Sequence, residues 1–171
     1  MPESPVVTAR ALRTELVGFD PELFSGDDCA ALAEELARTE KACAAAGARA
    51  AARAAECGSH HRRGYADAVD WLARSAGSSR GQARAALGTV TALEDCPETS
   101  EAVVSGELSL AQGAEIARTE AECPGSEGEL MGLAKSASLA VLRDKARSRR
   151  LKSTDPEELH ARQHRARELR H

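Results

Sequence analysis

The sequence predicts an all-α fold in which one long helix packs on a cluster of short helices containing a helix-turn-helix-like unit. Alanine supplies 35 of the 171 residues, whereas valine, isoleucine and threonine together supply 17. Alanine favours helices, and the scarcity of β-branched residues disfavours sheets. A chain of this length with a formal net charge of −4 suits one compact unit. We therefore expect a single helical domain over residues 1–171.

The first two predicted helices differ greatly in length. Ser4-Pro5 supplies a cap and a first-turn proline for a short helix that ends near Gly18, because serine caps helices and proline suits their first turn. Residues 28–57 form a stretch rich in Ala, Glu and Arg without proline. A helix of about 30 residues rises roughly 45 Å, and Gly58 is expected to end it.

Seven-residue spacing along this long helix is compatible with a homodimer through residues 28–57, because a coiled coil repeats its contact positions every heptad. The small residues favour instead a helix that lies close against its neighbours within one bundle, and Thr39 and Arg53 weaken the dimer interpretation. The two seams consist of Cys29, Leu36, Cys43, Ala50 and Cys57, and of Leu32, Thr39, Ala46 and Arg53.

N-cap residues and helix-terminating glycines and prolines predict the boundaries of the remaining helices. The Ser109 to Gln112 spacing predicts a capping box, and Asp155-Pro156 is expected to begin a last helix. After a polar break at 58–64, the other predicted helices cover residues 65–76, 79–93, 98–105, 109–123, 128–135 and 138–152.

Residues 69–87 have the spacing of a helix-turn-helix. Ala73 is small where two helices would cross, and Gly77 can adopt the left-handed turn. The residues expected to pack between the helices are Leu72, Ala76, Ala83 and Ala86 or Leu87. The second helix would present Ser79, Arg80, Gln82 and Arg84 to DNA base edges. The alternative is an ordinary corner between two helices with solvated polar residues.

Charge is unevenly distributed. Residues 1–138 hold 13 basic and 22 acidic residues, whereas residues 139–171 hold ten basic and five acidic residues. Such a basic run can neutralise phosphates or balance the acidic body internally. The predicted backbone contacts are Arg143, Lys145, Arg147, Arg149, Arg150 and Lys152.

No catalytic residue, cofactor site or metal site is expected. The pair His160 and His164 and the cluster Cys57, His60 and His61 each lack a full ligand set. The five cysteines form no CxxC pair, which favours free thiols. No stretch reaches the roughly 20 apolar residues of a spanning helix, so we expect a cytoplasmic protein.

One family resemblance covers about residues 27–171, leaving 1–26 as an N-terminal helix and loop. The segments 70–83, 96–99, 104–112 and 139–143 resemble the actinobacterial domain of unknown function 222, or 13E12 repeat family, which commonly precedes an HNH endonuclease module. That module is absent here. An HNH site needs an Asn beside its His, and the chain contains no Asn, so no nuclease residue carries over. A fragment of a longer endonuclease is an alternative interpretation.

The same block is similar to the helix-turn-helix region of ParB-type chromosome-partitioning proteins, through Ala73, Gly77, Ser79-Arg80 and Gly106 to Ser109. Together these resemblances imply a non-catalytic DNA-binding or DNA-targeting module with double-stranded DNA as its partner. The alternative is a helical protein-interaction or dimerisation module.

Overall fold

The computed structural model describes residues 4–153, which form eight α-helices, three 3₁₀ helices and no strand. The all-α prediction is therefore confirmed. The α-helices are α1 (Pro5–Val17), α2 (Gly26–Glu56), α3 (Ala68–Ala76), α4 (Arg80–Ala92), α5 (Pro97–Val104), α6 (Leu110–Glu122), α7 (Glu127–Ala134) and α8 (Leu139–Ser153). The 3₁₀ helices are η1 (Pro21–Leu23), η2 (His61–Arg63) and η3 (Leu93–Asp95).

The helix boundaries follow the local signals with one notable shift. The third α-helix begins at Ala68 rather than near residue 65, because the Asp67 carboxylate accepts a hydrogen bond from the Val69 N–H and caps α3 there. The last predicted helix, from Asp155, lies outside the described residues. Within residues 4–153, no helix combines the length and the apolar character needed to cross a membrane.

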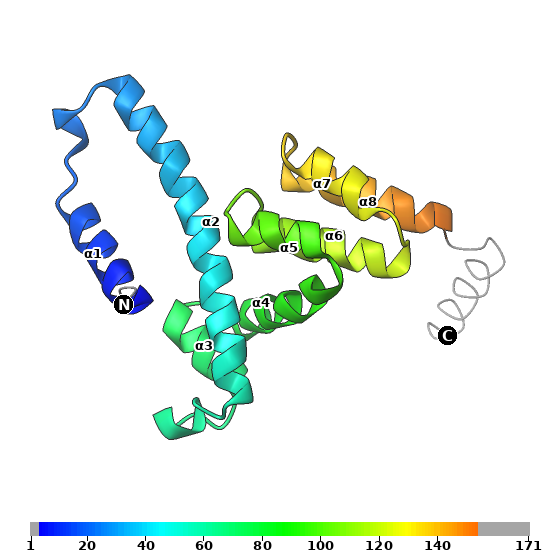
Figure 1. Ribbon diagram of the computed structural model, residues 1–171, viewed down its shortest axis with the longest axis horizontal. Helices are drawn as coiled ribbons and strands as arrows, with labels where there is room; N and C mark the ends of the chain where they lie inside the picture. The colour runs from blue at the N-terminus through cyan, green and yellow to red at the C-terminus, as the bar shows by residue number, and fades with distance from the viewer. Residues whose placement is uncertain (1–3, 154–171) are drawn as a thin grey trace, which may run out of the picture. The chain divides into compact units, whose positions relative to one another are not determined.

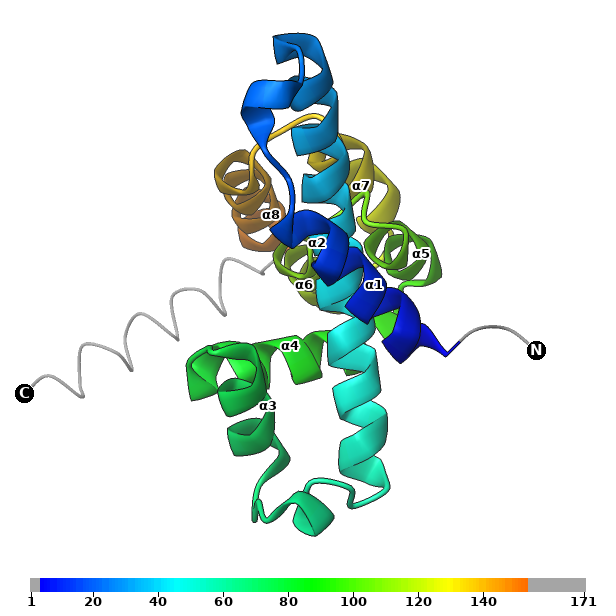
Figure 2. The same cartoon turned by 90° about the vertical axis from the view of Figure 1, so that its left-hand side faces the viewer.

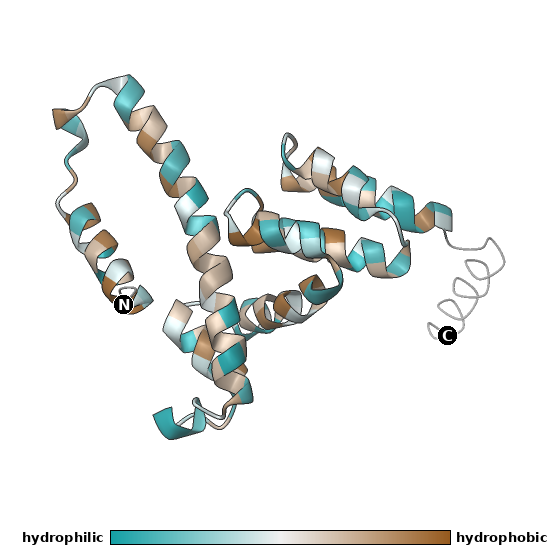
Figure 3. Ribbon diagram, viewed as in Figure 1, coloured by the Kyte–Doolittle hydropathy of each residue, from teal (hydrophilic) through white to brown (hydrophobic). Residues whose placement is uncertain are grey.

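The chain divides into two compact units, residues 1–37 and 38–171. The first unit holds α1, η1 and the first part of α2, and none of its described residues is buried. Several of its apolar side chains are more than half exposed, namely Val6, Val7, Val17, Leu23 and Phe24. Brown residues mark this apolar character along α1 in Figure 3. The first unit thus has no buried core of its own.

The second unit is organised around α6, which packs against α4, α5, α7 and α8. Figures 1 and 2 show α3 and α4 lying apart from α7 and α8, with α6 between α4 and α8. Aliphatic side chains from these helices and their turns form the buried core, namely Leu93, Val103, Leu108, Ile116, Leu130 and Leu142. Burial of such side chains is the main favourable contribution to folding.

The C-terminal part of α2 joins this core through alanines. Ala45, Ala48 and Ala51 are buried. Gly106 lies against α2 with φ of 80°, and a Cβ at this position would overlap the carbonyl oxygen of Arg38. Small residues therefore bring α2 close to its neighbours, as one of the two interpretations predicted. The buried alanines are not those of the seams, because Cys43, Ala46, Ala50, Arg53 and Cys57 are exposed.

Two carboxylates cap helices that lack a cap from their own N-cap side chain. Glu120 accepts hydrogen bonds from the backbone N–H groups of Gly125, Ser126 and Glu127 at 2.6 to 2.7 Å, at the start of α7. Glu127 accepts from the N–H and the hydroxyl of buried Thr99 at 2.8 and 2.7 Å, in the first turn of α5. These bonds satisfy otherwise unpaired N-terminal donors and tie α5, α6 and α7 together.

Candidate nucleic-acid interface

The α3 and α4 helices pack against each other through a short turn. Gly77 ends α3 with φ of 62° and ψ of 28°, a left-handed conformation that glycine adopts without steric cost. Ala73 and Ala83 are buried, and Leu72, Ala86 and Leu87 are half-buried. Ala76 is exposed, so its predicted packing role is wrong. Because Ala76 directly precedes the Gly77 cap, it lies at the turn that joins the two helices.

Ser79 and Gln82 form a capping box at the start of α4. The Ser79 hydroxyl accepts from the Gln82 N–H at 3.1 Å, and the Gln82 side-chain oxygen accepts from the Ser79 N–H at 2.9 Å. Two N-terminal donors of the helix are thereby satisfied. Both side chains are exposed, but the acceptor oxygens predicted to meet base edges are engaged within the protein. Their role in DNA binding stays a prediction.

Arg80 binds two aspartates of α3 and its cap. Its guanidinium donates to Asp67 Oδ2 at 2.6 Å and lies 3.2 Å from Asp70 Oδ1. The hydrogen bond from the Val69 N–H, together with that from Arg80, holds the pKa of Asp67 below its ordinary value. Arg80 therefore braces α4 against α3.

Arg84 is exposed like Arg80 but, unlike Arg80, forms no ion pair among residues 4–153. Arg62, Arg63 and Arg74 share both properties, and the sequence prediction missed these three. The signal was present in the composition, since residues 60–92 hold five arginines against two aspartates. Averaging over the acidic part of the chain, residues 1–138, concealed that local excess.

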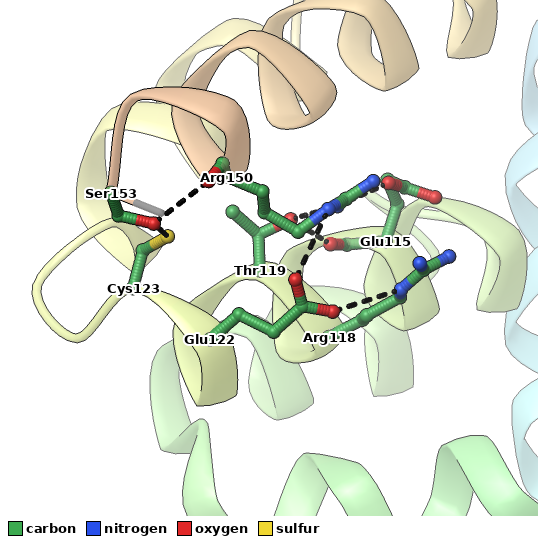
Figure 4. A network of polar contacts seen from close by, with 7 residues as sticks. All are labelled: Glu115, Arg118, Thr119, Glu122, Cys123, Arg150 and Ser153. Carbon is green, nitrogen blue, oxygen red and sulfur yellow. Dashed lines mark hydrogen bonds and ion pairs between the residues drawn. The ribbon is translucent and has the colours of Figure 1, made fainter. Parts of the chain in front are cut away.

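The basic run on α8 divides into paired and unpaired residues. Arg150 is 13% exposed, and its Nη1 donates to Glu115 at 2.7 Å and to the Thr119 hydroxyl at 2.6 Å. Its Nε lies 3.6 Å from the Glu122 carboxylate. Figure 4 shows this network between α6 and α8, with Cys123 and Ser153 beside it. Arg150 thus links two helices, and its charge is balanced inside the protein.

Glu129 of α7 pairs with two further cations of the run. Lys145 lies 2.9 Å and Arg149 3.2 Å from its carboxylate oxygens, and the hydrogen bond from Lys145 lowers the pKa of Glu129. Arg143, Arg147 and Lys152 are exposed and form no ion pair among the described residues. Figure 3 shows the hydrophilic character of α8. Half of the predicted phosphate contacts therefore neutralise acidic side chains of the same chain.

The two candidate metal clusters lie in different parts of the chain. His160 and His164 lie outside the described residues. His60 is buried, its ring centroid lies 4.0 Å from that of His61, and its Nδ1 has no hydrogen-bond partner among the described residues. Cys57 is exposed. Across residues 4–153, no group of three His, Cys, Asp or Glu side chains is positioned to hold a metal ion.

No family model matches the sequence, and neither a curated protein nor a solved structure matches it.

Proposed function

We propose that this chain is a non-catalytic DNA-binding or DNA-targeting helical module. The observation that carries the proposal is the excess of positive charge over residues 60–92, which form α3, α4 and the turn before α3. Asp67 and Asp70 are the only acidic residues between positions 60 and 92, and both contact Arg80. The other four arginines of this segment form no ion pair among the described residues, so they are available to phosphates.

The rest of the molecule supports the same partner. Arg143, Arg147 and Lys152 of α8 add exposed cations, and backbone contacts of this kind raise affinity without adding sequence information. The resemblance to proteins associated with HNH endonucleases also favours DNA as the partner.

Fluorescence anisotropy of the full chain on mixed-sequence duplex DNA tests the proposal. We expect saturable binding at about 50 mM salt that weakens steeply toward 200 mM, because each phosphate contact releases condensed counterions. Absence of binding at low salt would remove the DNA-binding function for this chain.

A protein-interaction or dimerisation module is the second candidate function. It is favoured by the exposed seam residues Cys43 and Ala50 of α2 and Cys57 directly after it, and by the exposed apolar side chains of the first unit. Sedimentation velocity at two protein concentrations tests it. A concentration-dependent dimer supports this function, whereas a monomer at both concentrations excludes self-association through α2.

A further inference from the structure

We infer that Arg62, Arg63 and Arg74 form a phosphate clamp that holds the backbone of duplex DNA. The inference rests on the proposed function and deepens it, because it assigns phosphate contacts to residues outside both predicted sets, 79–84 and 143–152. The clamp comes from two segments, the turn after α2 and helix α3. All three side chains are exposed.

Two of the clamp arginines, Arg63 and Arg74, each lie over an aromatic ring. The guanidinium carbon of Arg63 lies 5.9 Å from the centroid of the Trp71 ring, and that of Arg74 lies 6.0 Å from the centroid of the Tyr65 ring. A ring attracts a guanidinium by its quadrupole but leaves the full positive charge in place. A carboxylate, as at Arg80, would neutralise that charge. The rings therefore order these arginines and keep them competent for phosphate.

The turn that carries Arg62 and Arg63 is internally hydrogen-bonded. The carbonyl oxygen of buried His60 accepts from the N–H groups of Arg63 and Tyr65, each at 3.1 Å. Arg62 donates from Nη2 to the Ser59 hydroxyl at 2.9 Å. Side chains that are already ordered lose less conformational entropy on binding. This ordering distinguishes the clamp from solvated arginines elsewhere on the surface.

Phosphate suits this surface better than bases do. A single-strand binding surface needs open aromatic faces for stacking, but here one guanidinium lies over each of the two rings. Base-edge readout needs side chains presented from an element in the major groove. The clamp arginines lie on α3 and the preceding turn instead of on α4, whose first-turn groups are engaged by capping and ion pairing.

The test compares two triple variants of the full chain with the wild type in the anisotropy assay. R62Q/R63Q/R74Q removes the clamp. R10Q/R13Q/R49Q is the matched control, because it removes three exposed arginines that form no ion pair among residues 4–153. We expect the clamp variant to bind at least about tenfold more weakly at 50 mM salt. Its slope of log affinity against log salt should fall by about three, one per lost contact.

Two further readouts separate phosphate contact from other roles. The loss should be equal on an A·T-rich and a G·C-rich duplex, because phosphates carry no sequence information. R62K/R63K/R74K should retain the salt slope, since lysine also neutralises phosphate. A clamp variant that binds like the matched control would overturn the inference and leave the proposed function standing. Failure of the wild type to bind would overturn both.

Arginine footprinting needs no variant and therefore remains decisive if the clamp variant loses helicity. Phenylglyoxal modification of the wild-type chain is quantified by mass spectrometry with and without duplex DNA. Protection of Arg62, Arg63 and Arg74, with unchanged modification of Arg10 and Arg13, supports the clamp. Equal modification of all five in both samples contradicts it.

Discussion

At the scale of single residues, Arg80 determines how much positive charge the α3–α4 unit presents. It contacts both aspartates of that segment, so Arg84 forms no ion pair with them, although its charge also lowers the pKa of Asp67. Sequence reasoning placed Arg80 at the DNA surface because a recognition helix presents its first turn to bases. It could not foresee the ion pairs, because Asp67 and Asp70 become neighbours of Arg80 only after α3 and α4 pack.

Replacing Asp70 with Asn should strengthen DNA binding. The change removes one negative charge and one of the two partners of Arg80, 3.2 Å away. We expect affinity at 50 mM salt to rise about two- to tenfold, while stability changes by less than about 1 kcal/mol because the pair is exposed. Anisotropy checks the result. Asp27→Asn, at an exposed aspartate in the first turn of α2, is the matched control, and equal affinity of both variants would contradict the role given to Asp70.

The cysteines should differ strongly in reactivity. Burial raises the pKa of the Cys96 thiol to about 11, whereas Cys43 and Cys57 are exposed. Because the thiolate is the nucleophile, titration with Ellman's reagent at pH 8 should label Cys43 and Cys57 first. Cys96 should react only after unfolding in guanidinium chloride, where all five thiols become available. Rapid labelling of Cys96 in the folded chain would contradict its burial.

At the scale of helices, the sequence predicts boundaries where the cap is local and misses caps supplied from a distance. The Ser109–Gln112 capping box at α6 was predicted and is confirmed. The same Ser-x-x-Gln pattern at Ser79 was available but was interpreted as a DNA contact. By contrast, Glu120 and Glu127 cap α7 and α5 from six and more residues away. No local spacing rule describes such caps.

Glu120→Gln should weaken the second unit in a pH-dependent manner. The N–H groups of Gly125, Glu127 and Ser126 lower the pKa of Glu120, so its stabilising effect is complete above the ordinary carboxyl pKa. That effect is lost as pH falls through the lowered folded-state value. We expect the variant to lose roughly 1–3 kcal/mol at pH 7 and less near pH 3. Urea unfolding at both values measures this, and an equal loss at both would contradict the assignment.

At the scale of the whole molecule, the buried core belongs to residues 38–171 and the described part of the first unit buries nothing. Composition predicted the helical class because alanine content determines which secondary structure is favoured. The heptad pattern did not predict which face of α2 is buried. Alanine supplies 14 of the 31 residues of that helix, so the sequence leaves several faces equally able to pack.

Deletion of residues 1–24 should therefore leave stability nearly unchanged. We expect the unfolding free energy to fall by less than about 1 kcal/mol, because no described residue of that segment is buried. Leu142→Ala in the full chain should cost about 2–5 kcal/mol, since Leu142 is fully buried. Chemical denaturation compares the two. A deletion as costly as the Leu142 change would show that the first unit stabilises the fold.

The alanine face of α2 also makes this protein convenient for spectroscopy. Because Ala45, Ala48 and Ala51 face the core, Cys43 and Cys57 point away from it. Cys43 lies within α2 and Cys57 directly follows its last residue, Glu56, so the two thiols are fourteen residues apart, about 21 Å along the helix axis. Two dyes or spin labels attached to these natural thiols would report the distance between the ends of this segment. A change in that distance on partner binding would reveal bending of α2.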